Sequence, residues 1–319
     1  MKKGIAVAGT ILLDKINEIS AYPNSGELTK IKAIQYAVGG MVPNDGIDIK
    51  KIKPDIPVKA LGKVGADGEG KFVLNVLKEN GLDVSGVIID QKEKTSFTDV
   101  MSVVGGQRTF FTYAGASADF GFDSIDWENL DVKMLHLGYF LLLDKVDGGD
   151  GLKILMEAKK RDIKTSIDLV SENSDRYNLV RPCLPYVDNL IVNETEGCKL
   201  CGLEVKAENI PTALQALKDL GVRERVIIHT PEFGMCFDGK NITTVKSFKL
   251  PDGYIKGTTG AGDAFCAGAL IGIYEGRSDE EILEMATVSA ACSLRTADAT
   301  GGMETYEEMD KFCSRFEKR

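Results

Sequence analysis

The chain has 319 residues, of which 43% are apolar, and a formal net charge of −9. This length and composition suit a globular protein with a sizeable core, as one large domain or two smaller ones. The acidic balance argues against a nucleic-acid surface, which needs basic patches. No apolar run approaches the roughly 20 residues of a membrane span. The glycine-interrupted start, MKKGIAVAGTILLD, is typical of a strand rather than a signal peptide. We therefore expect a cytoplasmic protein with neither a membrane nor a nucleic acid as partner.

The seven cysteines are an odd number spread over a long chain, which favours reduced thiols over a disulfide framework. Cys198 and Cys201 form a C-x-x-C pair. A zinc site there would need two more ligands, and both histidines, His136 and His229, lie far away in the sequence. We interpret the pair as two free thiols on or near a helix.

Strand-like and helix-like segments alternate along most of the chain. Short apolar runs predict strands, and apolar positions at helical spacing predict helices. In chain order we expect a strand at 5–9, a helix at 67–80, a strand at 132–138, a helix at 151–161, strands at 165–169 and 189–193, a helix around 210–217, a strand at 226–230 and two closing helices at 279–295 and 304–316. This rhythm predicts an α/β fold with a mostly parallel sheet and helices on both faces.

Two segments, 14–38 and 95–114, interrupt this rhythm with strand-like alternation. The second reads as a hairpin with Gly105 and Gly106 as a two-residue turn. Both segments are expected to contribute to one small β-sheet beside the main domain. Such a sheet could be a lid over a site or a surface ribbon without function.

The stretch GTTGAGDAF, residues 257–265, places a glycine-rich turn at the start of an apolar helix. Free amides and the helix dipole make such a turn a pocket for an anion, plausibly a phosphate. Asp263 would repel that anion unless it has a task, such as taking a proton from an attacking hydroxyl. The alternative is an ordinary first-turn acid, which the helix dipole also favours. The turn alone leaves both interpretations open.

Four motifs, in order, resemble those of the ribokinase-like (PfkB) carbohydrate kinases. They are VGGMVPN at 38–44, LGKVGADGEG at 61–70, NETE at 193–196 and GTTGAGDAF at 257–265, and the resemblance covers about residues 4–302. It implies a three-layer α/β/α core with a small β-sheet lid. The core would comprise 1–13, 39–94 and 115–319, and the lid 14–38 and 95–114.

The resemblance implies transfer of a phosphoryl group from ATP to a hydroxyl of an unphosphorylated sugar or related polyol, in the manner of ribokinases and fructokinases. Asp263 would be the general base, and the amides of Gly260, Ala261 and Gly262 would form an anion hole for the transferring group. Asn193 and Glu196 would help to hold Mg²⁺, largely through water molecules.

By the same resemblance, the sugar would be bound by Asp14, Gly39, Gly40 and Asn44. The nucleotide would lie against Thr230, Gly234, Thr259, Gly260 and Gly262. As isolated residues, those at the sugar positions would indicate only a turn and a cap.

The sequence departs from the family pattern at several positions. Gly257 stands where an aspartate usually opens the last motif and helps to form a monovalent-cation site, so activation by K⁺ is not expected, and Lys256 could supply a fixed charge instead. Pro231 and Thr287 replace residues common near the nucleotide, and Asp45 after Asn44 could add an acceptor to the sugar site.

Two alternative functions stay open. A nucleoside kinase of the same fold could cover a base with Phe110, Phe111 and Tyr113 of the hairpin, although these fit ordinary strand alternation. The other alternative function is a catalytically silent sugar-binding regulator, and the intact Asp263 argues against it.

Two features of the lid bear on its contacts. Arg108 is the one candidate contact for the phosphate of a phosphorylated sugar substrate. The edge and apolar face of the lid also make a homodimer through 14–38 or 95–114 plausible.

Overall fold

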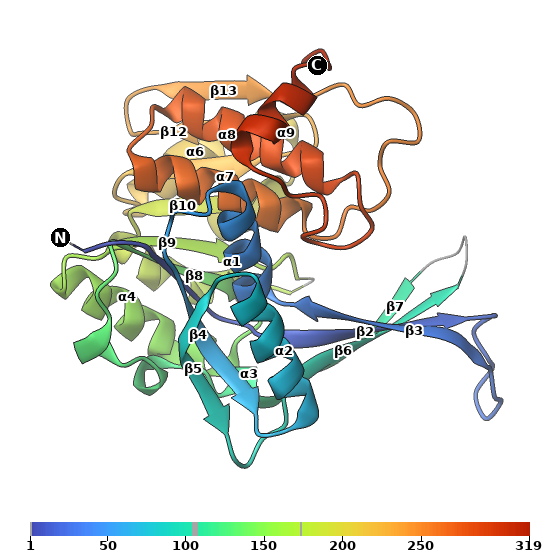
Figure 1. The fold of residues 1–319 in the computed structure, drawn as a ribbon. Helices are drawn as coiled ribbons and strands as arrows, with labels where there is room; N and C mark the ends of the chain where they lie inside the picture. The colour runs from blue at the N-terminus through green and yellow to red at the C-terminus, as the bar shows by residue number, and fades with distance from the viewer. Residues whose placement is uncertain (1, 104–107, 173) are drawn as a thin grey trace.

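A computed structural model describes residues 2–103, 108–172 and 174–319, and these form two sheets of unequal size (Figure 1). The large sheet has the strand order β13-β12-β11-β10-β9-β8-β1-β4-β5, and its neighbours are parallel except for the antiparallel pairs β11-β12 and β12-β13. Its strands are β1 (Ile5–Ala8), β4 (Val58–Gly65), β5 (Asp83–Asp90), β8 (Met134–Phe140), β9 (Lys164–Leu169), β10 (Asn189–Asn193), β11 (Arg225–His229), β12 (Phe233–Phe237) and β13 (Ile242–Lys246).

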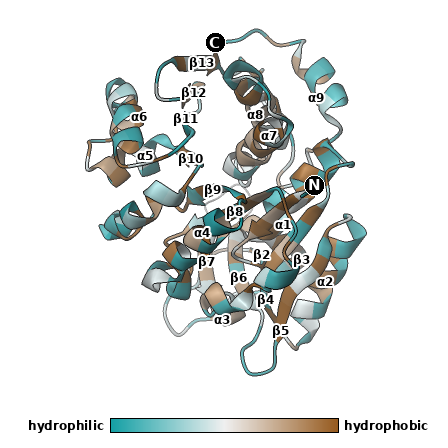
Figure 2. Ribbon diagram, turned by 90° about the vertical axis from the view of Figure 1, so that its left-hand side faces the viewer, coloured by the Kyte–Doolittle hydropathy of each residue, from teal (hydrophilic) through white to brown (hydrophobic). Residues whose placement is uncertain are grey.

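Helices cover both faces of the large sheet, so the core has three layers. Successive side chains of β1 point to opposite faces, and Ile5 and Val7 lie in one apolar cluster while Ala6 and Ala8 lie in the other. The first cluster contains side chains from α1 (Met41–Ile52), α2 (Gly68–Glu79), α7 (Ala261–Glu275), α8 (Asp279–Ser293) and α9 (Tyr306–Cys313). The second contains side chains from α4 (Gly151–Lys160), α5 (Glu194–Cys201) and α6 (Ile210–Asp219). Figure 2 shows the apolar colour running through α7, most of which is buried.

The α/β fold and each helix and strand expected in the core are confirmed, with ends that differ by a few residues. The helix α1 was not expected, because its sequence, MVPNDGIDIKKI, includes a proline, an asparagine and a glycine, which are poor helix formers. Almost every residue of α1 is buried, including Asp45 and Asp48. Tertiary packing therefore stabilises this helix where intrinsic propensity does not.

The small sheet has the order β3-β2-β6-β7 and extends away from the core (Figure 1). It consists of β2 (Leu12–Ile19), β3 (Ile31–Gly39), β6 (Ser96–Val103) and β7 (Arg108–Tyr113). The antiparallel pairing of β6 with β7 confirms the hairpin, whereas the predicted Gly105-Gly106 turn lies outside the described residues. The assignment of 14–38 and 95–114 to a separate lid domain stays a prediction.

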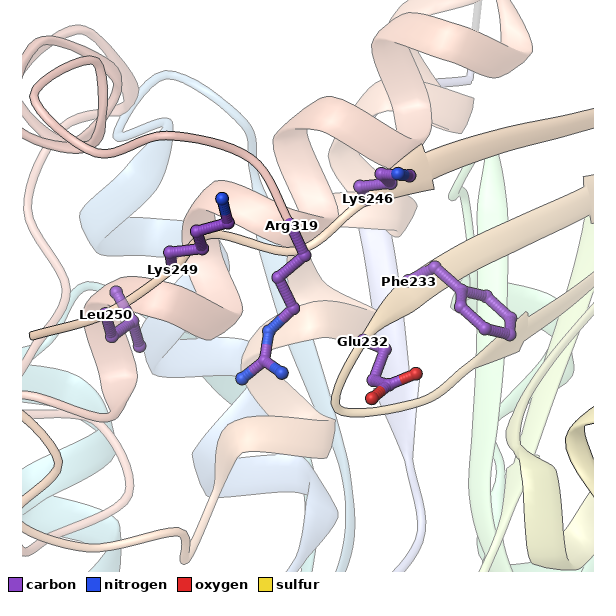
Figure 3. A pocket seen from close by; sticks show the side chains of 6 residues that line it. All are labelled: Glu232, Phe233, Lys246, Lys249, Leu250 and Arg319. Atoms are coloured by element: carbon purple, nitrogen blue, oxygen red, sulfur yellow. The ribbon is translucent and has the colours of Figure 1, made fainter.

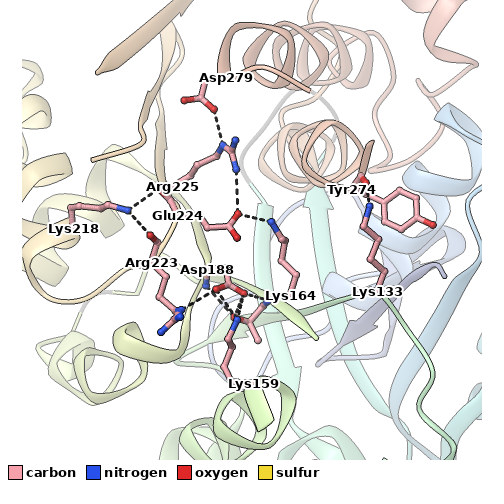
Figure 4. A network of polar contacts seen from close by, with 11 residues as sticks. Lys133, Lys159, Lys164, Asp188, Lys218, Arg223, Glu224, Arg225, Tyr274 and Asp279 are labelled. Carbon is pink, nitrogen blue, oxygen red and sulfur yellow. Dashed lines mark hydrogen bonds and ion pairs between the residues drawn. The ribbon is translucent and has the colours of Figure 1, made fainter. Parts of the chain in front are cut away.

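A network of ion pairs lies where the parallel strands β9, β10 and β11 begin (Figure 4). Asp188 accepts hydrogen bonds from Lys159 Nζ at 2.8 and 2.7 Å and from the amide of Thr165 at 2.8 Å. Arg225 Nε donates to Asp279 Oδ1 at 2.7 Å. Because α/β proteins bind ligands at the carboxyl ends of parallel strands, we assign this network to stability.

In the described ranges, no helix combines the length and apolar character that crossing a bilayer requires.

Candidate active site

The turn before α7 has the geometry that the glycine-rich sequence predicts. Gly260 is the N-cap with φ of 79°, and a Cβ on it would lie 2.6 Å from Cα of Ala299. A side chain there would therefore meet both backbone strain and a backbone neighbour. A Cβ on Gly262 would meet only Cε1 of His229, at 3.9 Å, so Gly262 leaves space for a ligand near the helix end.

The free amides of this turn differ in part from the expected set. The amide of Ala261 donates to the carbonyl of Thr258 at 3.2 Å, and that of Ala264 donates to the carbonyl of Gly260 at 2.8 Å. Within the described residues, no acceptor is present for the amides of Gly260, Gly262 and Asp263. The turn and the start of α7 can therefore offer these three donors to an anion, while the amide of Ala261 is already engaged in the turn.

The carboxylate of Asp263 is buried and held by two side chains from other elements. Asn44 Nδ2 donates to Oδ2 at 2.8 Å, and the hydroxyl of Tyr139 donates to Oδ1 and Oδ2 at 3.0 Å each. Burial, and then the nearby charge of Asp168, raises the pKa of Asp263 to about 6, while the bonds from Asn44 and Tyr139 oppose that rise. The group is therefore an anion at neutral pH that can still accept a proton.

Asp263 borders a cavity of about 400 Å³ at the carboxyl ends of the parallel strands. Acidic and other polar side chains from β8, β9, β10, α5 and the start of α7 line this cavity together with the aliphatic residues Leu142, Leu169, Val170 and Ile191. Its lining includes Tyr139, Asp168, Ser171, Asn193, Glu196, His229, Gly260, Gly262, Asp263 and Cys266. The sequence-predicted residues Asn193, Glu196, Gly260, Gly262 and Asp263 thus meet around one space.

A second cavity, of about 430 Å³, adjoins the first and shares Asn193, His229 and Gly262 with it. Its far part is largely apolar, as a site for a flat ring requires. The lining there includes Thr230, Pro231, Phe248, Leu250, Ile255, Phe265, Thr287, Ala290, Ala291 and Leu294. The hydroxyl of Thr287 is buried without a hydrogen-bond partner among the described residues. A ligand in this cavity could supply that partner.

Basic side chains flank the second cavity. Lys246, Lys249 and Arg319 line a neighbouring shallow pocket together with Glu232, and Arg319 also lines the second cavity itself (Figure 3). The backbone of residues 317–319 is fixed there, because the amide of Arg319 donates to the carbonyl of Ser247 at 2.9 Å. These cations add favourable potential for a polyanionic ligand.

Asn193 and Glu196 form a capping box at the start of α5. Asn193 Oδ1 accepts from the amide of Glu196 at 2.9 Å, and Glu196 Oε2 accepts from the amide of Asn193 at 3.0 Å. Glu196 Oε1 also accepts from Ser171 Oγ at 2.8 Å. Burial raises the pKa of Glu196 to about 8. Because these oxygens already accept hydrogen bonds, the pair fits Mg²⁺ that is bound through water better than direct coordination.

The remaining predicted residues lie near the junction of the two sheets or apart from both cavities. Asp14 is on β2 and pairs with Ala37 of β3, and a Cβ on Gly39 would lie 2.4 Å from Asp14 Oδ2. Burial raises the pKa of Asp14 to about 6. A Cβ on Gly40 would meet the carbonyl of Thr10. Gly234 lines neither cavity, and a Cβ there would lie 3.0 Å from the ring of Phe265, so its smallness serves packing.

Sequence reasoning missed Tyr139 and Asp168. Tyr139 has φ of 57° near the end of β8, and its amide donates to Asp168 Oδ1 at 2.5 Å. Positive φ in a tyrosine is strained and marks a position that the surrounding structure fixes. Both residues lie near the carboxyl ends of predicted parallel strands, where α/β proteins place their ligand contacts. Their positions at these strand ends were therefore the signal in the sequence that could have identified both residues.

The comparisons with known proteins agree with this geometry. The model of the pfkB family carbohydrate kinases matches residues 3–306. A ribokinase from Arabidopsis thaliana is 25% identical over 94% of this chain and 78% of its own length, and a 5-dehydro-2-deoxygluconokinase from Clostridium botulinum is 22% identical over 89% and 86%. The structure of the Arabidopsis thaliana ribokinase complexed with ribose and ATP superposes with a TM-score of 0.84, covering 98% of this chain and 99% of that one at 24% identity. Because the family model spans nearly the whole sequence, this chain belongs to the pfkB family of carbohydrate kinases and is a phosphotransferase.

Proposed function

We propose that the protein transfers the γ-phosphoryl group of ATP to a hydroxyl of an unphosphorylated sugar or related polyol, with Asp263 as the general base. The observation that carries this proposal is the position of Asp263. Its buried carboxylate borders the acidic cavity beside the free amides of α7, where that cavity joins the apolar one. This arrangement places a proton acceptor and an anion-binding helix end on one wall.

In this proposal, Asn44 and Tyr139 orient Asp263 toward the acceptor hydroxyl. The carboxylate takes the hydroxyl proton as the oxygen attacks phosphorus. The amides of Gly262 and Asp263 donate to the phosphoryl oxygens, where negative charge accumulates. These donors are fixed by the helix and need no rearrangement during the reaction. The amide of Ala261 is replaced in this role by that of Asp263, because Ala261 donates within the turn.

ATP would occupy the apolar cavity with its phosphates directed toward α7. Thr287 offers its unpaired hydroxyl to the base, Thr230 lines the wall, and Arg319 lies close enough to the cavity to favour a polyanion. Mg²⁺ would neutralise part of the phosphate charge. Asn193 and Glu196, which form the capping box of α5 and line the acidic cavity, would hold the ion through water molecules.

The sugar would lie between Asp263 and the base of the small sheet. Asp14, Gly39 and Gly40 are the proposed contacts there, with Asn44 bridging to Asp263. The carboxylates of Asp168 and Asp263 on the cavity wall disfavour a substrate that already carries a phosphate. A nucleoside acceptor is the second candidate, because Phe110, Phe111 and Tyr113 expose their rings on the hairpin and could cover a base.

The experiment is a direct assay of ADP formation over a panel of sugars, polyols and nucleosides, with Asp263→Asn as the test variant. Asp55→Asn removes an exposed carboxylate that lines neither cavity and is the matched control. We expect turnover with one class of acceptor, normal in Asp55→Asn and reduced at least about 10³-fold in Asp263→Asn. Turnover that survives Asp263→Asn would refute the assignment of the base.

We also propose a homodimer through the small sheet. Its strand β3 is exposed along most of its length, and Ile31, Ile34, Tyr36, Phe110 and Phe111 are all about half exposed. Light scattering after size exclusion should give twice the chain mass for the native protein and the monomer mass for Phe110→Asp. We also propose a cytoplasmic location, which the seven free thiols support because such thiols persist in a reducing compartment.

A further inference from the structure

A cluster of four ligand-type side chains lies beneath Asp263, and none of the four takes or donates a proton in the proposed phosphoryl transfer. It consists of Asp45 on α1, His136 on β8, Asp168 on β9 and Cys266 on α7, and its four ligand atoms lie within 4.8 Å of one another. All four residues are buried. The cluster thus joins two helices of one layer to two neighbouring strands of the large sheet.

The distances from His136 Nε2 fit a tetrahedral metal site. They are 3.5 Å to Asp45 Oδ2, 3.7 Å to Asp168 Oδ2 and 3.6 Å to Cys266 Sγ. With ordinary zinc–ligand bond lengths, a tetrahedron separates its nitrogen and oxygen ligands by about 3.4 Å and its sulfur and nitrogen ligands by about 3.6 Å. The two carboxylate contacts of His136 are longer than ordinary hydrogen bonds, while its contact with Cys266 Sγ is within the range of a hydrogen bond to sulfur. All four ligand atoms are close enough together for one ion to contact them after local adjustment.

The buried carboxylate of Asp45 is a second, independent observation. Asp45 is fully buried, and neither of its oxygens has a hydrogen-bond partner of ordinary length among the described residues. Its neighbours in the cluster are His136 Nε2, at 3.5 Å from Oδ2, and the thiol of Cys266, which is a weak donor. A buried carboxylate without partners is costly, and a cation would remove that cost.

The surroundings of His136 and Asp168 resemble the outer shell of a metal site. His136 Nδ1 lies 2.9 Å from Ser166 Oγ, a contact that orients the ring and leaves Nε2 directed at the other three ligands. Asp168 Oδ1 accepts from the amide of Tyr139, which leaves Oδ2 toward the cluster. Asp168 and Cys266 also line the 400 Å³ cavity, which gives an ion a route in.

We propose that Asp45, His136, Asp168 and Cys266 bind one zinc-type divalent cation in a closed tetrahedral site beneath Asp263. The mixed nitrogen, sulfur and oxygen donor set favours Zn²⁺ over the Mg²⁺ of the phosphoryl-transfer site, which prefers oxygen alone. On binding, the metal replaces the thiol proton of Cys266 and any proton on Asp45, and these protons leave to solvent. The ion ties α1 and α7 to β8 and β9, so its role is to fix the floor of the active site.

The test uses the full chain, stripped with a chelator and titrated with Co²⁺ and then with Zn²⁺. We expect one equivalent of Co²⁺ per chain, the visible bands of tetrahedral cobalt, and a near-ultraviolet thiolate-to-cobalt absorption that Zn²⁺ abolishes. Zn²⁺ should also raise the unfolding temperature by several degrees. Cys266→Ser should remove the thiolate absorption, and Asp45→Asn should weaken binding at least about tenfold.

Cys236→Ser is the matched control, because Cys236 is equally buried but lies on β12 outside the cluster. Circular dichroism of each metal-free variant separates loss of the site from loss of the fold, and Asp45→Asn stays informative if Cys266→Ser unfolds. Binding well below one equivalent, or a thiolate absorption that persists in folded Cys266→Ser, would overturn the proposal. These readouts do not involve turnover, so they are independent of whether Asp263 is the base.

Discussion

Replacing Tyr139 by phenylalanine is the sharpest test of how Asp263 is tuned. The phenol donates to both carboxylate oxygens, each at 3.0 Å, and this contact lowers a pKa that burial and Asp168 raise to about 6. A hydrogen bond to a charged group contributes about 1.5–3 kcal/mol, and water from the adjoining cavity would replace part of it. A net loss of about 1.4 kcal/mol moves the pKa of Asp263 up by about one unit, to about 7.

The expected consequence is a pH-dependent defect in kcat/KM. If Asp263 is the base as proposed, a shift of about one unit lowers its ionised fraction at pH 6 from about one half to about one tenth, while at pH 8 the fraction stays above about nine tenths. The variant should therefore lose about fivefold at pH 6 and little at pH 8. The assay is direct quantification of ADP from about pH 5 to pH 9, on protein stripped of transition metals and supplied with Mg²⁺.

The charged and titratable groups around Asp263 come from several elements: Asp45 and Asp48 on α1, His136 on β8 and Asp168 on β9. Tyr139→Phe leaves all of them in place. Tyr274→Phe is the control, because the Tyr274 hydroxyl accepts from the amide of Gly4 at 3.0 Å, next to the amino end of β1 and so at the other end of the parallel strands. An equal rate loss at every pH, with the acidic limb still near pH 6, would show that Tyr139 does not tune the base.

Three further predictions concern the glycine turn and the buried charge. Gly262→Ala should fold normally, since its Cβ has space, yet it should lose activity because the methyl group blocks the phosphoryl oxygens. Gly260→Ala should lose activity and also unfold at a lower temperature, because its Cβ would meet Ala299 and its φ is positive. Gly276→Ala, with φ of 74° and open surroundings, is the control for backbone strain alone. Asp263→Asn should stabilise the fold by about 1–3 kcal/mol at pH 7 and not at about pH 4. The pKa of Asp263 is raised in the folded protein, so its ionisation lowers the free energy of unfolding as pH rises from about 4 to about 6, and asparagine avoids this loss. Denaturant unfolding at both pH values measures the difference. Turnover should be the same in K⁺ and in a large organic cation, because Gly257 offers no carboxylate where the usual aspartate would help to bind the ion. Clear activation by K⁺ would contradict this.

The predictable part of this structure is the part that local sequence determines. The hairpin at 95–114 follows from period-two alternation, and its pairing of β6 with β7 is confirmed. The NETE segment predicts both a helix cap and, by resemblance, a metal contact, and its capping box has both reciprocal hydrogen bonds. Such signals lie within a few residues of one another, so no knowledge of the tertiary fold is needed to read them.

The unpredictable part depends on strand order. Tyr139 and Asp168 touch because β8 and β9 are neighbours in the sheet, and Asp263 reaches Tyr139 because α7 begins beside the carboxyl ends of these strands. Nothing in the local pattern of VKMLHLGYF marks its tyrosine as a partner of a carboxylate 124 residues later. The helix α1 is a similar case, since burial rather than propensity forms it, and with it the positions of Asn44 and Asp45.

The same dependence explains why the glycine-rich motif alone left Asp263 ambiguous between a first-turn acid and a base. A first-turn acid next to solvent has an ordinary or lowered pKa, because the helix dipole and free amides stabilise its charge. Asp263 has the opposite shift, since burial and Asp168 outweigh the bonds from Asn44 and Tyr139. A carboxylate used only as a cap would gain nothing from being buried among other acids, and stability alone would favour its removal. Its surroundings make sense if the group has to take up a proton near neutral pH, and they are built by α1, β8 and β9, which the motif does not include.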